Sequence, residues 1–288
     1  MTKLIKIKDP HSIITTFSSN LHFPESLEVS KSKYFDVIKN FCNLINSSSS
    51  TNDLLKKIRS KDIKGKDRIN YLKLFRRCVS SVCDTEMTKK INTITNQTII
   101  KNYGHTFKDI KELKKQFKNL DNKIIYSLSS LLFEYDSRGF QGYALTEEFF
   151  KWFKNTFKDY QIFGPTGAGK DIELKEVVKD FNKSFPCDFI IKKNNKILSV
   201  GFARYDSTRG GSQSDDRTEG NSNKVFKLKE YCENKKTKIK IIFLSDGPGL
   251  AAKDTWKSNC ELEEMWSDNI LVTTLKLCEK KITKSWLE

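Results

Sequence analysis

The sequence lacks several features that would assign it to a common class of protein. No apolar run approaches the roughly 20 residues of a membrane-spanning helix, and the N-terminus, MTKLIKIKDPHS, lacks the apolar stretch of a signal peptide. None of the seven cysteines forms a C-x-x-C pair, and Cys78 and Cys83, the closest two, have no second pair or histidine nearby to complete a zinc site. These absences predict a cytoplasmic protein with reduced thiols and no membrane partner.

Positive charge and aromatic residues are abundant instead. The 288 residues include 52 Lys and Arg against 36 Asp and Glu, a net charge of +16, and 20 Phe, 9 Tyr and 4 Trp can fill a core. Residues 1–145 hold +12 of this charge and residues 146–288 hold +4. Such a field favours a polyanionic partner, above all nucleic acid, although the lysine-rich codon usage of a low-GC genome would produce the same excess.

The pattern of apolar residues changes along the chain. The first half is predicted to be helical, and a break near Gly65 divides the stretch 54–77 into two helices. The second half alternates short apolar runs with helical patterns, which predicts a mixed β-sheet flanked by helices. We therefore expect an α/β (α+β) protein with a helical region at 1–145 and a sheet-containing region at 146–288. Predicted helices are 31–46, 122–134, 146–157, 171–181, 224–234 and 254–266, and predicted strands are 186–193, 196–206, 238–246 and 269–277.

The stretch 54–77 is the most basic part of the first half. It holds ten Lys and Arg against two Asp, and one face of its helices is expected to be solvated. If the partner is DNA, this stretch is the first choice for phosphate contacts, which position a protein without reading bases. The residues expected to make them are Lys56, Lys57, Arg59, Lys64, Lys66 and Arg68.

The stretch FGPTGAGKD, 163–171, matches most of a nucleotide-binding phosphate loop. Such a loop needs a strand before it, a helix after it and a Ser or Thr after the lysine. Here a helix is expected before it, Asp171 follows Lys170, and IIFLSD at 241–246 is the only candidate for the magnesium-binding strand. A glycine turn with Asp171 capping the next helix is favoured, and a P-loop NTPase stays the third hypothesis.

Charged residues concentrate in PCDFIIKKNNKILSVGFARYDSTRGGSQSDDRTEG, 186–220. Asp188 opens an apolar strand, a hairpin returns a second strand that ends in Arg204-Tyr-Asp206, and a charged loop follows. Clustered carboxylates need a compensating charge, and magnesium binds through one or two carboxylates plus a substrate phosphate. A nearby cation would stabilise charge on that phosphate. These groups suit metal-assisted hydrolysis of a phosphodiester.

The Pro-x-Asp, the hairpin and the basic residue on the second strand resemble the core of the PD-(D/E)XK nucleases. The strings GPTGAGKD, FARYDSTRGGSQSDDRTEGN and LSDGPG are similar to those of a group of type II restriction endonucleases, and the resemblance covers about 160–288. It implies a magnesium-dependent, sequence-specific endonuclease of double-stranded DNA. It also implies a homodimer, because two-fold sites match two-fold proteins, and a DNA methyltransferase as genetic companion.

Two positions depart from that family's pattern. Phe202 stands where its second acid is usual, and Arg204 stands where its lysine is usual, although arginine can only hold charge and orient water or phosphate. The second carboxylate must therefore come from elsewhere. A non-catalytic, sequence-specific DNA-binding protein on a degenerate nuclease fold is the alternative hypothesis.

The register of the hairpin decides whether Asp188 and Arg204 share a face of the sheet. A two-residue turn that pairs Lys193 with Lys196 places Arg204 on the opposite face, whereas a three-residue loop places both on one face. The nuclease interpretation therefore predicts the three-residue loop.

The candidate residues fall into three groups by expected role. Asp246 is expected to be a turn residue, and no role is expected for the three histidines. Catalytic candidates are Asp188, Arg204, Asp206 and Glu173. Metal candidates are Asp188, Asp206, Asp215 and Asp216. Base-reading candidates are Arg209, Gln213 and Arg217.

Overall fold

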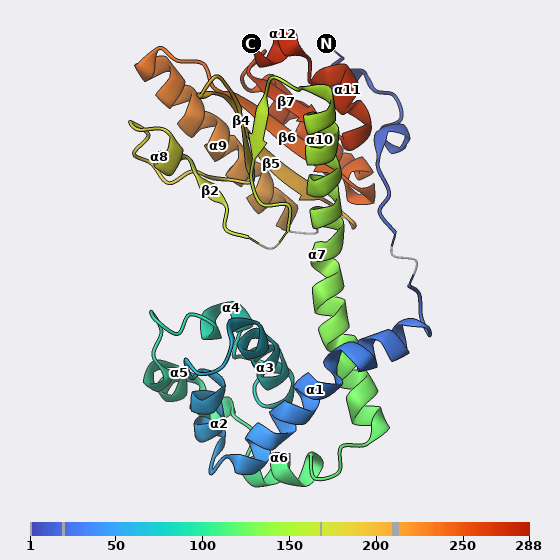
Figure 1. Ribbon diagram of the computed structural model, residues 1–288, viewed down its shortest axis with the longest axis vertical. Helices are drawn as coiled ribbons and strands as arrows, with labels where there is room; N and C mark the ends of the chain where they lie inside the picture. Colours follow the sequence, from blue (N-terminus) through green and yellow to red (C-terminus); the bar gives the residue numbers. More distant parts are fainter. Residues whose placement is uncertain (1, 19–20, 168, 209–212) are drawn as a thin grey trace. The chain divides into compact units, whose positions relative to one another are not determined.

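The computed structural model describes residues 2–18, 21–167, 169–208 and 213–288, except for the side chains of 137–139 and 213–218. The chain divides into two compact units (Figure 1). The sheet unit comprises Met1–Ser18 with Gly139–Glu288, and the helical unit comprises Ser19–Arg138. In the described part of the chain, no helix has the length and apolar character needed to cross a membrane.

Helices build the whole of the helical unit, around one apolar core of its own. Ser50 caps α2 by accepting from the Asp53 N–H, and α3 begins at Gly65, as the predicted break requires. Phe41 and Phe75 are fully buried in this core. The elements are α1 (Ser26–Ser47), α2 (Thr51–Ile58), α3 (Gly65–Cys78), α4 (Thr85–Thr88), α5 (Asn96–Tyr103), the 3₁₀ turn η3 (Gly104–Thr106), α6 (Ile110–Gln116) and the first part of α7 (Asn122–Thr156).

Two of the arginines predicted to contact DNA phosphates donate hydrogen bonds to backbone carbonyls of the helical unit. Arg59 is buried, and its guanidinium donates to the carbonyls of Thr88 and Ile94 at 2.8 and 2.5 Å. Arg68 is half-buried and donates to the carbonyls of Ser60 and Ile63 at 3.0 and 2.6 Å. A guanidinium can satisfy several loop carbonyls at once. Burial argues against a phosphate contact at Arg59, whereas the contact at the half-buried Arg68 stays a prediction.

The other four basic candidates keep more of their surface. Lys56, Lys64 and Lys66 are exposed. Lys57 is partly buried and is held by the Ser47 carbonyl at 2.5 Å. The helical unit has 23 Lys and Arg against 13 Asp and Glu, a net charge of +10, whereas the sheet unit has a net charge of +6.

A five-stranded mixed sheet forms the centre of the sheet unit, with the strand order β1-β4-β5-β6-β7 (Figure 1). The pairs β1–β4 and β4–β5 are antiparallel, and the pairs β5–β6 and β6–β7 are parallel. A separate two-stranded ladder joins β2 to β3. The strands are β1 (Gln161–Phe163), β2 (Ile172–Glu173), β3 (Pro186–Cys187), β4 (Phe189–Lys193), β5 (Lys196–Tyr205), β6 (Lys240–Asp246) and β7 (Ile270–Thr273).

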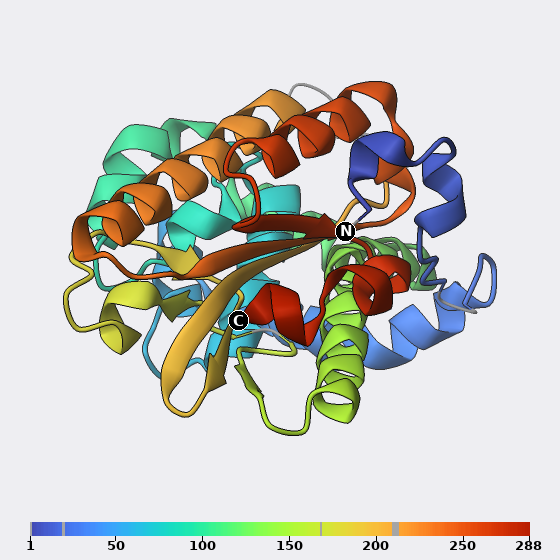
Figure 2. The same cartoon turned by 90° about the horizontal axis from the view of Figure 1, so that it is seen from above.

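Helices cover both faces of this sheet, which confirms the predicted mixed sheet flanked by helices. Figure 2 shows α9 (Gln213–Lys235) and α10 (Lys253–Glu264) side by side across one face. Phe202 and Phe243 point to this face, where Leu228 of α9 and Leu262 of α10 pack. The other face packs against the second part of α7 and the C-terminal helices. The remaining elements are α8 (Leu174–Val177), α11 (Cys278–Lys281), α12 (Lys284–Leu287) and the 3₁₀ turns η1 (Leu4–Lys6), η2 (Pro10–Ile13), η4 (Pro248–Ala251) and η5 (Leu275–Leu277).

The predicted domain boundary near residue 145 differs from the division in the structure. Leu4 is fully buried in the core of the sheet unit, and its N–H donates to the Glu263 carboxylate at 2.7 Å. The N–H of Thr15 donates to the Asp246 carboxylate at 2.8 Å. The first residues therefore complete the sheet unit, and the helical unit follows them in the sequence as an insertion.

Three predicted helices have different extents. The two helices predicted at 122–134 and 146–157 are parts of one continuous helix, α7, which runs through Gly139 and Gly142 without a break. The helix predicted from 224 begins at Gln213 as α9, within the predicted loop. The helix predicted at 171–181 is reduced to α8, and Asp171 precedes the strand β2 instead of capping a helix.

Candidate active site

Asp188 lies between β3 and β4, where two other segments hold its backbone. Its N–H donates to the Gly201 carbonyl at 2.9 Å, and its Oδ2 accepts from the Ala203 N–H at 2.7 Å. Gly164 passes close by with φ = +153°, and a Cβ there would lie 2.2 Å from the Asp188 carbonyl oxygen. Only glycine allows this approach, so the first glycine of GPTGAGKD serves to let the chain pass Asp188.

A β-bulge places Asp188 and Arg204 on one face of the sheet. The turn has two residues, Asn194 and Asn195, with positive φ, so the predicted three-residue loop was wrong. Ile191 pairs with Ser199 and Lys192 with Ile197, which leaves Leu198 unpaired. This extra residue shifts the register by one. Phe189 therefore faces Gly201, and the shared face is obtained by the bulge instead of by the loop.

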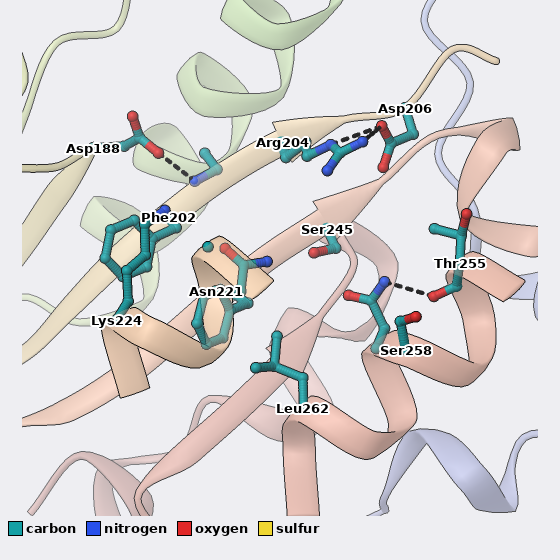
Figure 3. A pocket seen from close by; sticks show the side chains of 14 residues that line it. Asp188, Phe202, Arg204, Asp206, Asn221, Lys224, Ser245, Thr255, Ser258 and Leu262 are labelled. Atoms are coloured by element: carbon teal, nitrogen blue, oxygen red, sulfur yellow. Dashed lines mark hydrogen bonds and ion pairs between the residues drawn. The ribbon is translucent and has the colours of Figure 1, made fainter. Parts of the chain in front are cut away.

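Asp188 opens into a pocket of about 390 Å³ between β5, β6, α9 and α10 (Figure 3). Its walls combine the rings of Phe202 and Phe243 with charged groups. Its polar lining comes from the sheet and from both helices. The polar and charged lining residues are Asp188, Arg204, Asp206, Asn221, Lys224, Ser245, Thr255, Ser258 and Asn259.

Lys224 of α9 is the cation that acts on Asp188. Its Nζ lies 3.9 Å from the centre of the Phe202 ring, and it occupies the pocket wall beside Asp188 (Figure 3). Burial lowers the pKa of Lys224, and the negative charges of Asp188 and Asp171 partly oppose that shift. Burial raises the pKa of Asp188, and the Ala203 hydrogen bond and the Lys224 charge partly oppose that shift. Each group is thus held in a site that disfavours its charged form.

Arg204 is committed to a different partner. Its Nε donates to Asp206 Oδ1 at 2.7 Å, and its Nη2 donates to the same oxygen (Figure 3). Asp206 is buried, and its backbone N–H and carbonyl bond to Asp246 and Gly249. Arg204 and Asp206 both line the pocket, as predicted for site residues. The charges that act on the pKa of Asp188 are those of Asp171 and Lys224, so Lys224 is a second cation of this pocket, beside Asp188.

The segment 164–171 does not have the structure of a phosphate loop. A short strand, β1, precedes it, contrary to the predicted helix, and the two-residue strand β2 follows it. Lys170 is exposed and pairs with Glu176 at 3.3 Å. Asp246 of the proposed magnesium-binding strand is fully buried and accepts from three backbone N–H groups. The buried and fully bonded Asp246 carboxylate and the strand that directly follows the segment both argue against an NTPase.

Several predicted site residues lie outside the pocket or cannot be placed. Glu173 accepts from the Phe185 N–H at 3.0 Å and from the Ser184 hydroxyl at 3.2 Å, and it does not line the pocket. Its carboxylate thus fastens the β2–β3 ladder. Gln213, Asp215, Asp216 and Arg217 fall in the first turns of α9, whose side chains are not described, and Arg209 lies outside the described residues.

The described part of the chain contains no cluster of three or more His, Cys, Asp or Glu side chains suited to a metal ion. The charge of Asp171 contributes to the raised pKa of Asp188, but Asp171 is exposed and does not line the pocket. Magnesium is satisfied by one or two carboxylates when waters and a substrate phosphate complete its shell. Asp188 lines the pocket and can therefore serve as one such carboxylate.

The sequence patterns missed Lys224 and Asp171. Lys224 lies 20 residues beyond Arg204 in a helix with several other lysines, so no local spacing distinguishes it. Asp171 follows Lys170 in the loop-like motif, and its position there resembled a helix cap. Only the folded arrangement brings their charges to Asp188.

Comparisons of the chain with protein-family models, with curated proteins and with solved structures found no match.

Proposed function

We propose that the protein is a magnesium-dependent endonuclease that hydrolyses phosphodiester bonds in double-stranded DNA at a specific sequence, as a type II restriction endonuclease does. The observation that carries the proposal is the pair of Asp188 and Lys224 in one polar pocket, each with a pKa shifted against its charged form. Opposed shifts of this kind concentrate at sites of proton transfer and phosphate chemistry. The net charge of +16 supports a polyanionic substrate.

In this mechanism, Asp188 would hold magnesium through a carboxylate oxygen, with waters and a substrate phosphate completing the shell. The ion would supply a lowered pKa for a bound water molecule and neutralise charge on the phosphate. The Ala203 N–H holds Asp188 Oδ2 at 2.7 Å, so the carboxylate keeps one orientation while its other oxygen stays available. A bound cation would also stabilise the ionised carboxylate and so offset the effect of burial, which raises the pKa of Asp188.

Lys224 has two tasks next to that carboxylate. Its ammonium donates hydrogen bonds to the attacking water or to a phosphate oxygen, where negative charge increases in the transition state. Its lowered pKa also lets it give up a proton more readily than a solvated lysine. The Phe202 ring beneath it fixes its position and limits access of water.

Arg204 has a supporting role in this proposal. With Asp206 as its partner, it adds no net charge to the pocket wall, and it holds the end of β5 in place. Cleavage of both strands would need two such sites, which implies a homodimer. A cell that makes such an enzyme would also need a methyltransferase that protects the same sequence.

A non-catalytic DNA-binding protein is the second candidate. The observation in its favour is that no cluster of three or more metal-ligand side chains occurs in the described residues. This protein would bind DNA through its basic helical unit, and substitution of Asp188 would leave its function unchanged.

A cleavage assay distinguishes the two candidates. Purified protein is incubated with supercoiled plasmid and with phage DNA, in magnesium and in EDTA. Discrete fragments that appear only with magnesium support the endonuclease. Intact DNA together with a salt-sensitive gel shift supports the non-catalytic binder.

A further inference from the structure

The helical unit carries a surface whose composition differs from the rest of the chain. Residues 87–105, MTKKINTITNQTIIKNYGH, contain no Asp or Glu, whereas the whole chain has 36 in 288 residues, or one in eight. This segment holds three lysines, three asparagines, one glutamine and four threonines. None of its four isoleucines is exposed, so it offers no apolar docking surface. The surface is cationic and rich in hydrogen-bonding groups.

α5 presents these groups in a regular array. Ile99 is fully buried, and Gln97 and Lys101, one turn apart, lie on the opposite side of the helix. Thr98 and Asn102 are a second exposed pair one turn apart, and Asn102 Nδ2 donates to the Thr98 carbonyl at 2.8 Å. Two rows of polar side chains therefore face solvent along one helix.

The buried Arg59 holds the loop that precedes α5. Its guanidinium donates to the carbonyls of Thr88, Lys90 and Ile94 at 2.8, 3.5 and 2.5 Å, and to the side chain of Asn96. An irregular polar loop has little apolar surface to bury and would otherwise be poorly ordered. The guanidinium fixes both the loop and the first residue of α5, which prepares the surface before any partner binds.

These features fit the edges of base pairs. Asn and Gln form bidentate hydrogen bonds with adenine, and Lys donates to guanine. An α-helix with its side chains is about 10–12 Å in diameter, which fits the major groove of B-DNA, about 12 Å wide. The absence of carboxylates removes repulsion from the phosphates on either side.

We propose that the exposed side of α5, formed by Gln97, Thr98, Lys101 and Asn102, reads base pairs in the major groove of double-stranded DNA. This inference rests on the proposed function, because it supplies the sequence specificity of that nuclease. It replaces the region after β5 as the principal reader. Arg59 acts as a positioning residue for this surface.

Selection of bound duplexes from a random-sequence library tests the inference. The full chain is used in EDTA, so that no DNA is cut. Wild-type protein is expected to select a defined motif. Gln97→Ala and Asn102→Ala should each reduce the preference at one or two base pairs by about tenfold or more. Lys101→Ala should weaken binding at the base pair that it contacts and also overall.

Two variants on α6 serve as matched controls. Gln116 and Lys115 are exposed in the same helical unit, and Gln116→Ala and Lys115→Ala should leave the motif unchanged. A motif that is identical in the α5 variants and the wild type would overturn the inference. So would a wild-type protein that selects no motif, or one that prefers RNA of the same sequence.

The outcomes separate this inference from the proposed function. Magnesium-dependent cleavage with a motif insensitive to α5 would refute only the reading surface. A motif that depends on α5, without cleavage at any magnesium concentration, would support the reading surface and refute the nuclease.

Discussion

Two aspartates beside strands of the central sheet, Asp246 at the end of β6 and Asp188 before β4, have opposite environments. Asp246 is fully buried, and its carboxylate accepts hydrogen bonds from the N–H groups of Thr15, Gly247 and Leu275 at 2.8, 2.8 and 2.9 Å. Asp188 is half-buried, and the hydrogen bond found for its carboxylate among the described residues comes from Ala203. The more deeply buried carboxylate is thus the better satisfied one.

This difference distinguishes a carboxylate that stabilises the fold from one whose environment suits the proposed reaction. Asp246 joins the N-terminal segment, β6 and η5, so its hydrogen bonds stabilise the fold. Asp188 has a raised pKa and a cation, Lys224, with a lowered pKa nearby. A group that is buried without full compensation destabilises the fold, and such strain is commonly kept for a ligand or a reaction.

The largest expected effect on stability is at Asp246. Asp246→Asn replaces an acceptor oxygen by an NH₂ group that faces a backbone N–H, so at least one buried donor loses its partner. We expect the free energy of unfolding to fall by about 3 kcal/mol, measured by urea denaturation. Cleavage per folded molecule should be unchanged. A loss of activity without a loss of stability would contradict the structural role of Asp246.

The two cations of the pocket, Lys224 and Arg204, are expected to differ in their effect on the cleavage rate. Lys224→Met should reduce the cleavage rate about 100-fold, equivalent to about 2.7 kcal/mol. Because the Lys224 charge lowers the pKa of Asp188, its removal should also move the acidic limb of the pH–rate profile to higher pH.

Arg204→Met is the matched variant for this test. It removes the ion pair between Arg204 and the buried Asp206 carboxylate, so we expect lower stability and a smaller loss of activity per folded molecule. Equal rate losses in the two variants, with no shift of the profile, would contradict the assignment of Lys224.

A smaller effect is expected in the pH dependence of stability. The folded protein binds the Asp188 proton more tightly than the unfolded chain does, because burial raises its pKa above 3.8. The ionised form therefore destabilises the wild type as pH rises from about 3.8 through the raised pKa. Asp188→Asn should melt at a higher temperature than wild type at pH 7, and the difference should vanish near pH 3.5.

Asp180→Asn is the control for this measurement, because that carboxylate is mostly exposed. It should change the melting temperature little at either pH. If Asp188→Asn melts at a lower temperature than wild type at pH 7, the ionised Asp188 carboxylate does not destabilise the folded protein and this prediction is wrong.

The smallest effect is expected at Lys170. Its side chain is 78% exposed, and its ion pair with Glu176 is at the surface. Lys170→Ala should change the cleavage rate less than twofold and the free energy of unfolding by less than about 0.5 kcal/mol. ATP binding that depends on Lys170, detected by calorimetry, would instead revive the NTPase.

The sequence predicted those parts of the fold that depend on neighbouring residues. The helices on either side of Gly65, the apolar strand after Asp188 and the turn at Asp246 were all expected from local patterns. The continuous α7 was missed because Gly139 and Gly142 lower helix propensity, while packing of the later part of the helix against the sheet overrides them.

The candidate site could be predicted only in part, because it is assembled from distant segments. Asp188 was expected from its place before an apolar run. The two-residue turn alone would place Arg204 on the face opposite Asp188, and the bulge at Leu198 brings it back to the same face. No sequence rule located this bulge. Lys224 comes to the pocket of Asp188 through the packing of α9 on the sheet, and the charge of Asp171 acts on Asp188 from another segment.

The most direct test of the account compares Asp188→Asn with Asp246→Asn in the same plasmid-cleavage assay, normalised to folded protein. The account predicts that Asp188→Asn lowers the magnesium-dependent rate about 1,000-fold, equivalent to about 4 kcal/mol, and that Asp246→Asn leaves it unchanged. Full activity in Asp188→Asn would contradict the account, because the chemistry would then lie elsewhere in the molecule.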